Sequence, residues 1–328
     1  MNEQKINVGV VGAAGYTGGE LLRLLIFHPQ VNIVFAHSNS SGGKPVASVH
    51  TDLVGETDLA FSQDMVGDID VLFLCLGHGD SQKFLAQQSF PAHVKIIDLS
   101  QDFRVNPTFA DRQFTYGLPE LGTDKIRKAQ NIANPGCFAS AMQLALLPLA
   151  EQGLLQSDVH ISGITGSTGA GQSFSETSHF SWRDSNISAY KVLNHQHLNE
   201  MRRTLGTLQS NQAIPRINFV PYRGNFTRGI LCTTYLTCNW SIEEAYENYR
   251  RFYQNAAFTH VTDKNPHVKQ VVNTNKCLLY LEKHEDQLVI ISLIDNLLKG
   301  ASGQAVQNMN LLFNLPETSG LLLKPAGF

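Results

Sequence analysis

The sequence has 328 residues, of which 42% are hydrophobic and 16% charged, with a formal net charge of -3 at pH 7. This is globular composition at a length that allows two domains, and the slightly acidic balance excludes a nucleic-acid-binding surface. With no apolar run of roughly eighteen residues, no signal-peptide pattern and five cysteines without a CxxC pair, we expect a cytoplasmic protein with reduced thiols, no membrane span and no metal site.

The chain opens with a strand, a glycine-rich turn and a helix. Residues 6–11 are apolar and predict a buried strand, and residues 21–26 continue as a helix ending before His28-Pro29. Glycines between a strand and a helix let the backbone approach a pyrophosphate, which the helix N-terminus then binds. We therefore expect the cofactor-binding residues Gly12, Gly15, Tyr16, Thr17 and Gly18 in a Rossmann-type fold.

The second strand, expected at residues 32–36, lacks the acidic residue that binds the ribose 2′-hydroxyl of NAD. The segment after it, residues 37–44, offers hydroxyls, backbone N–H groups and Lys44. These groups suit a 2′-phosphate, so we expect NADP, with Ser38 and Ser41 as contacts. The alternative is a solvated Ser/Gly loop without a ligand.

Further apolar runs at residues 70–76 and 93–100 predict strands of a parallel sheet, because helices alternate with them. Ligands of such a sheet bind at the carboxyl ends of its strands. The character changes after residue 137, where strand candidates follow one another without alternating helices; they lie at residues 159–164, 217–220, 229–237, 269–272, 277–282 and 287–293. We expect an α/β protein with a Rossmann domain, residues 1–136 and 297–328, and an α+β catalytic and dimerisation domain, residues 137–296.

The turn Asn134-Pro135-Gly136 precedes Cys137 and an Ala-rich apolar helix, expected over residues 138–147. A cysteine at a helix start is close to free N–H groups and the positive end of the helix dipole, which favour the thiolate. Cys137 is therefore a candidate nucleophile. The alternative is a small buried side chain that packs the first helical turn.

Several short motifs, in order along nearly the whole chain, resemble the N-acyl-γ-glutamyl-phosphate reductases of the semialdehyde dehydrogenase superfamily. They are the glycine turn through Leu21 (GxxGYxGxEL), residues 98–104 (DLSxDFR), residues 116–121 (YGLPEL), residues 134–137 (NPGC), residues 228–230 (RGI) and residues 295–297 with 300–301 (DNL and GA). The family's HRHxPE reads His195-Gln196-His197-Leu198-Asn199-Glu200 here, which keeps both histidines and the glutamate.

The resemblance implies NADPH-dependent reduction of N-acetyl-γ-glutamyl phosphate to N-acetylglutamate 5-semialdehyde through a Cys137 thioester, in arginine biosynthesis. It implies that His197 is the acid/base, since imidazole titrates near neutral pH. It also implies a homodimer or homotetramer. The other implied contacts are with the substrate (Arg104, Asn134, His195 and Arg228) and with the nicotinamide end of the cofactor (Ser167, Gly169 and Asn296).

Three other functions stay open from the sequence alone. Aspartate-semialdehyde dehydrogenase shares the cysteine, the histidine and the cofactor fold. A non-catalytic NADP-binding sensor predicts an unreactive Cys137 thiol. The third is an N-succinyl substrate, because Arg183 and Arg223 stand where the family pattern has no arginine, and a guanidinium could meet an extra carboxylate.

Overall fold

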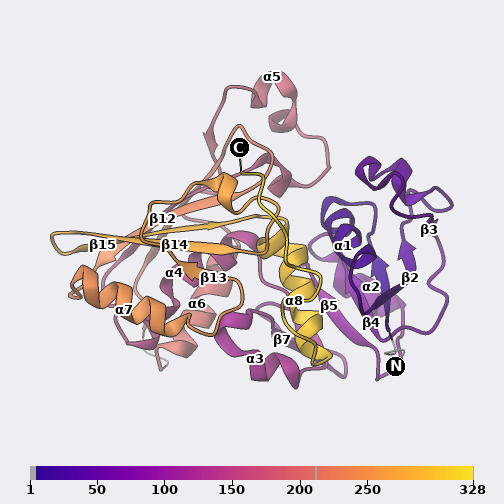
Figure 1. Cartoon of the computed structure of the whole chain (residues 1–328), viewed down its shortest axis with the longest axis horizontal. Coiled ribbons are helices and arrows are strands. Elements are labelled where there is room, and N and C mark those ends of the chain that lie inside the picture. The colour runs from indigo at the N-terminus through magenta and orange to yellow at the C-terminus, as the bar shows by residue number, and fades with distance from the viewer. Residues whose placement is uncertain (1–4, 211–212, 328) are drawn as a thin grey trace. The chain divides into compact units, whose positions relative to one another are not determined.

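The computed structural model describes residues 5–210 and 213–327 (Figure 1). The chain forms two compact units: the first runs to Pro135 and resumes at Ala301 to Leu322, and the second comprises Gly136–Gly300 and the residues from Leu323 on. The predicted boundaries were 136/137 and 296/297, with the C-terminal residues in the first domain. Residues 297–300 instead stay with the second unit, where a Cβ on Gly300 would lie only 2.7 Å from the Cβ of Cys137.

The first unit is built on an eight-stranded sheet in the order β3-β2-β1-β4-β5-β8-β7-β6. All its neighbours are parallel except β6 and β7. The strands are β1 (Ile6–Val11), β2 (Val31–His37), β3 (Phe61–Ser62), β4 (Val71–Leu74), β5 (Lys95–Asp98), β6 (Thr108–Phe109), β7 (Arg112–Tyr116) and β8 (Asn131–Ala133). The predicted Rossmann-type parallel sheet is confirmed.

The helices of this unit are α1 (Tyr16–Ile26), α2 (Asp80–Gln87), α3 (Pro119–Arg127) and α8 (Gly303–Leu312). The C-terminal helix α8 is buried along its whole length because it packs on α1, α3 and β5. Buried polar side chains of α8 find partners there: Asn310 contacts His28 at 3.0 Å, and Asn308 donates to the carbonyl of Gly117 at 2.9 Å. Helix α8 thus completes the first unit, whereas the residues from Leu323 on belong to the second.

The second unit contains a mixed sheet in the order β10-β11-β9-β12-β15-β14-β13, which confirms the predicted α+β class. Only the pairs β11–β9 and β13–β14 are parallel. The strands are β9 (Val159–Thr165), β10 (Ser188–Ala189), β11 (Ile217–Arg223), β12 (Ile230–Thr237), β13 (Thr259–Val261), β14 (Cys277–His284) and β15 (Gln287–Ile294), and the helices are α4 (Cys137–Glu151), α5 (Phe180–Arg183), α6 (His197–Leu208) and α7 (Ile242–Phe252).

Helix α4 is the core of the second unit, and Figure 1 shows it beside β12, β15 and α6. Every residue from Phe138 to Ala150 is buried. Its carbonyls receive hydrogen bonds from the surrounding elements: Ser292 of β15 donates to Ala141 at 2.9 Å, and Tyr249 of α7 donates to Ala145 at 2.5 Å. These bonds hold the helix, and with it the residue at its start.

One predicted strand is wrong, and six strands were not expected: β3, β6, β7, β8, β10 and β13. Residues 269–272 were expected as a strand, but Val268–Gln270 is a 3₁₀-helix, closed by a hydrogen bond from His267 N to Gln270 Oε1 at 2.8 Å. The valines at 271 and 272, of which only Val271 is buried, gave the false strand pattern. The short strands β7 and β8 lack an apolar run long enough to mark them. Within residues 5–210 and 213–327, no helix is both long and apolar enough to span a membrane.

Candidate active site

The glycine-rich turn lies between β1 and α1, at the carboxyl end of β1. Gly12 has φ +78°, and a Cβ there would lie 2.4 Å from the carbonyl oxygen of Cys75; a Cβ on Gly18 would lie 2.4 Å from the oxygen of Gly12. Gly15 differs, because a Cβ on it would meet only the Gly12 oxygen, at 3.5 Å. Protein packing thus accounts for Gly12 and Gly18, whereas glycine at 15 fits a ligand at the N-terminus of α1.

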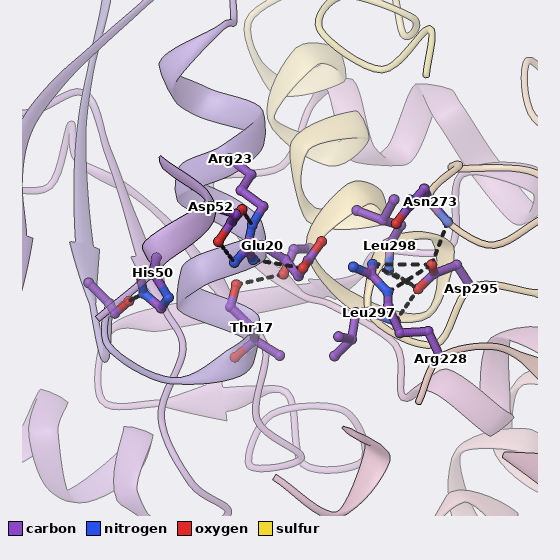
Figure 2. A network of polar contacts seen from close by, with 12 residues as sticks. Thr17, Glu20, Arg23, His50, Asp52, Arg228, Asn273, Asp295, Leu297 and Leu298 are labelled. Atoms are coloured by element: carbon purple, nitrogen blue, oxygen red, sulfur yellow. Dashed lines mark hydrogen bonds and ion pairs between the residues drawn. The ribbon is translucent and has the colours of Figure 1, made fainter. Parts of the chain in front are cut away.

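A polar network supports this turn, and the sequence did not predict it (Figure 2). His50 Nε2 lies 2.8 Å from the carbonyl oxygen of Ala13, and the ring is buried. Arg23 of α1 forms ion pairs with Glu20, at 2.7 Å, and with Asp52. The hydrogen bond from Arg23 lowers the pKa of the Asp52 carboxyl. The network ties α1 to the 3₁₀-helix Thr51–Leu53, so the helix start keeps a fixed orientation.

The remaining predicted cofactor residues of the first unit have structural roles as well. Thr17 accepts a hydrogen bond at its carbonyl from Ser302 Oγ at 2.8 Å, and the Tyr16 ring is 40% exposed at the first position of α1. Ser38 Oγ accepts from the backbone N–H of Ser41 at 3.2 Å, and both serines are buried. The Ser38 hydroxyl thus shapes the turn after β2, which leads to an exposed Lys44.

Arg104 and Asn134 lie in the first unit, where both are buried. Arg104 donates to the carbonyl of Asn134 at 2.8 Å and to that of Leu99 at 2.7 Å. Asn134 accepts at its side-chain oxygen from Asn308 at 3.0 Å. Burial raises the pKa of the nearby Asp98 carboxyl to about 6, although hydrogen bonds from serines and the charge of Arg104 act in the opposite direction.

Cys137 is the first residue of α4, as the turn chemistry predicted. Gly136 is the N-cap with extended backbone angles, and the Cys137 side chain is half-buried. Since Gly300 has no Cβ, its backbone can lie directly against Cys137. The thiol therefore sits at the positive end of a long buried helix, an environment that favours the thiolate.

Glu200 joins the Cys137 turn to His197. Its Oε2 accepts from the backbone N–H of Gly136 at 3.0 Å, and its Oε1 lies 4.0 Å from Nε2 of His197. Both side chains are buried on the first turn of α6. One carboxylate thus fixes the helix start that carries the cysteine and also faces the imidazole, an arrangement that supports proton transfer by His197.

His195 occupies an apolar pocket next to His197. Its ring packs edge-on against Phe138 at 5.8 Å and Phe219 at 5.5 Å, and it lies 4.6 Å from the His197 ring. Burial, assisted by the charge of Lys191, lowers the pKa of His195 to about 4. The ring is neutral at pH 7, and because Nδ1 accepts from the His197 N–H at 3.3 Å, the remaining proton is on Nε2.

Arg228 and Asp295 form a bidentate ion pair at the start of β12 (Figure 2). The Arg228 Nε and Nη2 atoms each lie 3.2 Å from a carboxylate oxygen, and the carboxylate is fully buried. Asp295 also accepts backbone N–H groups from Asn273, Leu297 and Leu298 at 2.8 to 3.1 Å. The sequence marked both residues as motif positions but could not pair them.

Asn296 fixes the second glycine-rich loop. It accepts from Gly229 N at 2.7 Å and donates to Thr168 Oγ1 at 3.0 Å. Thr168 lies between the predicted contacts Ser167 and Gly169 in a 3₁₀-helix that follows β9, and Gly169 is exposed. Across residues 5–210 and 213–327, no group of three or more His, Cys, Asp or Glu side chains is arranged to hold a metal ion.

Two family models match the chain: the NAD binding domain of semialdehyde dehydrogenase over residues 7–129, and the semialdehyde dehydrogenase dimerisation domain over residues 137–296. Among curated proteins, the N-acetyl-gamma-glutamyl-phosphate reductases of Parabacteroides distasonis and Azobacteroides pseudotrichonymphae are 54% and 55% identical to it. Each alignment covers 98% of this chain and 100% of the relative.

Two solved structures have the same fold. Aspartate semialdehyde dehydrogenase II from Vibrio cholerae matches with a TM-score of 0.74 and 19% identity, over 95% of this chain and 99% of that one. Aspartate semialdehyde dehydrogenase with NADP from Candida albicans matches with a TM-score of 0.69 and 15% identity, over 94% and 99%. At these identities the likeness establishes the fold, and the first unit is a nicotinamide-dinucleotide-binding domain.

Proposed function

The chain belongs to the N-acetyl-gamma-glutamyl-phosphate reductase family, and from this premise we propose that it reduces N-acetyl-γ-glutamyl phosphate to N-acetylglutamate 5-semialdehyde and releases phosphate. The observation that carries the proposal is the Glu200 carboxylate, which accepts from Gly136 N–H at 3.0 Å and lies 4.0 Å from His197. It links a thiol at a helix start to a buried imidazole, and an acyl-transfer enzyme requires that pair.

In the proposed reaction, the Cys137 thiolate attacks the γ-carbonyl carbon, the carbon–oxygen bond to phosphate breaks, and a thioester remains. When bound, the reduced nicotinamide supplies the hydride that reduces the thioester carbonyl. The carbon–sulfur bond then breaks, the semialdehyde leaves, and Cys137 returns to the thiolate. His197 takes the thiol proton before the attack and returns it to the Cys137 sulfur after the carbon–sulfur bond has broken, the role of a general acid/base.

We assign cofactor binding to the turn of Gly12, Gly15, Tyr16, Thr17 and Gly18. The open position of Gly15 supports this, because a Cβ there would not clash with the protein. We also propose a preference for NADPH, since the turn with Ser38 and Ser41 leads to Lys44 and no acidic residue ends β2. We further propose that Ser167, Gly169 and Asn296 contact the nicotinamide end.

For the substrate, we propose contacts with Arg104, Asn134, His195 and Arg228. The bidentate contact with Asp295 supports the proposed role of Arg228, because it fixes the orientation of this cation in the unit that carries Cys137. We also propose a homo-oligomer, on the basis of the matched dimerisation domain. A cytoplasmic location is supported by the five cysteines, none of which is in a disulfide, since a reducing compartment keeps thiols reduced.

The reverse reaction tests the function directly. With N-acetylglutamate 5-semialdehyde, phosphate and NADP⁺, the protein should produce NADPH, which is followed by the absorbance that distinguishes it from NADP⁺. With NAD⁺ in place of NADP⁺, kcat/KM should be much lower. Aspartate semialdehyde is the competing substrate. Faster turnover of aspartate semialdehyde would contradict the proposed substrate, and equal kcat/KM for the two cofactors would contradict the role of the Ser38–Lys44 turn.

A further inference from the structure

Arg223 carries a positive charge that the described protein leaves uncompensated. It is the last residue of β11, where it pairs with Ser188 of β10. Its guanidinium carbon lies over the Tyr190 ring, 4.8 Å from the centroid. The Nε atom is buried, and within residues 5–210 and 213–327 it has no hydrogen-bond partner and the guanidinium no carboxylate partner. A buried donor without a partner is costly, and an acceptor on a ligand would satisfy it.

Tyr190 places this arginine in the neighbourhood of the reacting residues. The Tyr190 ring packs edge-on against His195 at 5.9 Å, and its backbone N–H donates to the carbonyl of Pro221 at 3.1 Å. Burial raises the pKa of the Tyr190 phenol, the charge of Cys137 raises it further, and Arg223 acts in the opposite direction. Tyr190 is therefore within electrostatic reach of both Cys137 and Arg223.

Arg183, the other arginine absent from the family pattern, is engaged by the protein itself. Its Nη1 donates to the carbonyl of Arg223 at 3.0 Å, and its Nε and Nη2 donate to the carbonyl of Thr177 at 3.3 and 3.1 Å. Burial lowers the pKa of Arg183, and the nearby charge of Arg223 lowers it further. The two arginines therefore differ. Arg183 donates its hydrogen bonds to backbone carbonyls, whereas Arg223 has a buried Nε without a hydrogen-bond partner.

We propose that Arg223, oriented by Tyr190, binds a carboxylate of the substrate and contributes to specificity. The proposal rests on the proposed function, because it concerns the same site. A guanidinium edge of Nε and Nη binds a carboxylate through two parallel hydrogen bonds, and stacking on an aromatic ring holds that edge in place. Two carboxylates fit this chemistry: the α-carboxylate of every N-acylglutamyl substrate, and a terminal carboxylate on a dicarboxylic N-acyl group.

The test compares the wild type with Arg223→Gln and Arg223→Lys, and with Arg202→Ala, which removes a charge from an exposed position of α6. Initial rates are measured with N-acetyl- and N-succinylglutamate 5-semialdehyde, phosphate and NADP⁺. A charge-assisted bond predicts that Arg223→Gln raises KM by roughly 10- to 150-fold while kcat changes less than about threefold. Arg223→Lys should recover part of the loss, and Arg202→Ala should match the wild type.

The pattern of KM distinguishes the two carboxylates. An increase for both substrates identifies the α-carboxylate, and an increase for the succinyl substrate alone identifies the acyl carboxylate. Unchanged KM for both substrates overturns the proposal, as does a fall in kcat with KM unchanged. If Arg223→Gln fails to fold, the same criteria apply to Arg223→Lys, which keeps the charge but loses the bidentate geometry.

A binding assay keeps this proposal separate from the proposed function. N-acetylglutamate and N-succinylglutamate carry the carboxylates without a reacting group, and their protection of Cys137 from iodoacetamide is followed by mass spectrometry. Protection of the wild type that weakens about tenfold or more in Arg223→Gln supports the carboxylate contact even if the enzyme reduces neither semialdehyde. Equal protection in both proteins overturns it even if the wild type is fully active.

Discussion

Replacing His195 by Asn removes an imidazole that can titrate but keeps a hydrogen-bond acceptor for the backbone N–H of His197. His195 is 6% exposed, and burial is the main reason that its pKa falls from 6.5 to about 4. The side-chain oxygen of Asn lies close to the position of imidazole Nδ1, which accepts from the His197 N–H at 3.3 Å. We therefore expect His195→Asn to stay folded at neutral pH and to lose a pH dependence that the wild type has.

The sign follows from the two protonation states of the chain. The folded-state pKa lies below the unfolded value, so the unfolded chain binds the extra proton between pH 6.5 and 4. The stability from neutral His195 is present above about pH 6.5 and is lost as the pH falls towards 4. Between pH 7.5 and 4.5, this predicts a loss on the order of 2 kcal/mol in the free energy of unfolding that His195→Asn does not share.

Urea unfolding followed by tryptophan fluorescence at the two pH values measures this difference. Other titrating groups are common to both proteins, so their contributions cancel when the variant is subtracted from the wild type. His93→Asn removes an exposed imidazole and serves as the matched control, which should lose as much stability as the wild type. An identical loss in His195→Asn and the wild type would refute the neutral, buried His195.

Three further changes test the site. Cys137→Ser should abolish reduction and leave NADPH binding nearly intact, because a serine alkoxide forms far less readily at neutral pH; more than roughly a tenth of the wild-type kcat, a loss of only about 1.4 kcal/mol, would exclude Cys137 as the nucleophile. His197→Ala should lower kcat by about 10² to 10⁴, and far more than His195→Ala does; equal losses would reverse the two assignments. Gly300→Ala should reduce the rate of Cys137 alkylation and kcat together, because the new methyl group would lie 2.7 Å from the Cys137 Cβ; unchanged alkylation would show that the backbone relaxes.

Local sequence chemistry predicted the two turns that begin helices. The glycine spacing after β1 places α1, and the Asn-Pro-Gly turn places Cys137 at the first position of α4. Both features depend on backbone angles and free N–H groups within a few neighbouring residues, so a single sequence is enough to predict them. The valines at 271 and 272 show the limit: their apolar pattern suggested a strand, but they follow the 3₁₀-helix Val268–Gln270, and only Val271 of the two is buried.

Contacts between distant residues could not be predicted in this way. Glu200 is 64 positions from Gly136, yet their hydrogen bond connects the nucleophile turn to α6. No sequence motif marks Tyr190, although its ring packs against His195 and lies against the Arg223 guanidinium. Aromatic residues and arginines have no periodic pattern that marks such a pairing, and the folded chain alone reveals it.

The Arg228–Asp295 pair shows why such long-range contacts matter for the site. Replacing a buried ion pair by apolar side chains is often neutral or stabilising, so stability is a weak reason to keep one. Asp295 is fully buried and also accepts backbone N–H groups from Asn273, Leu297 and Leu298. These bonds fix the carboxylate, and the bidentate contact then fixes the plane of the Arg228 guanidinium. The pair therefore orients the Arg228 cation, which supports the proposal that Arg228 contacts an anionic group of the substrate.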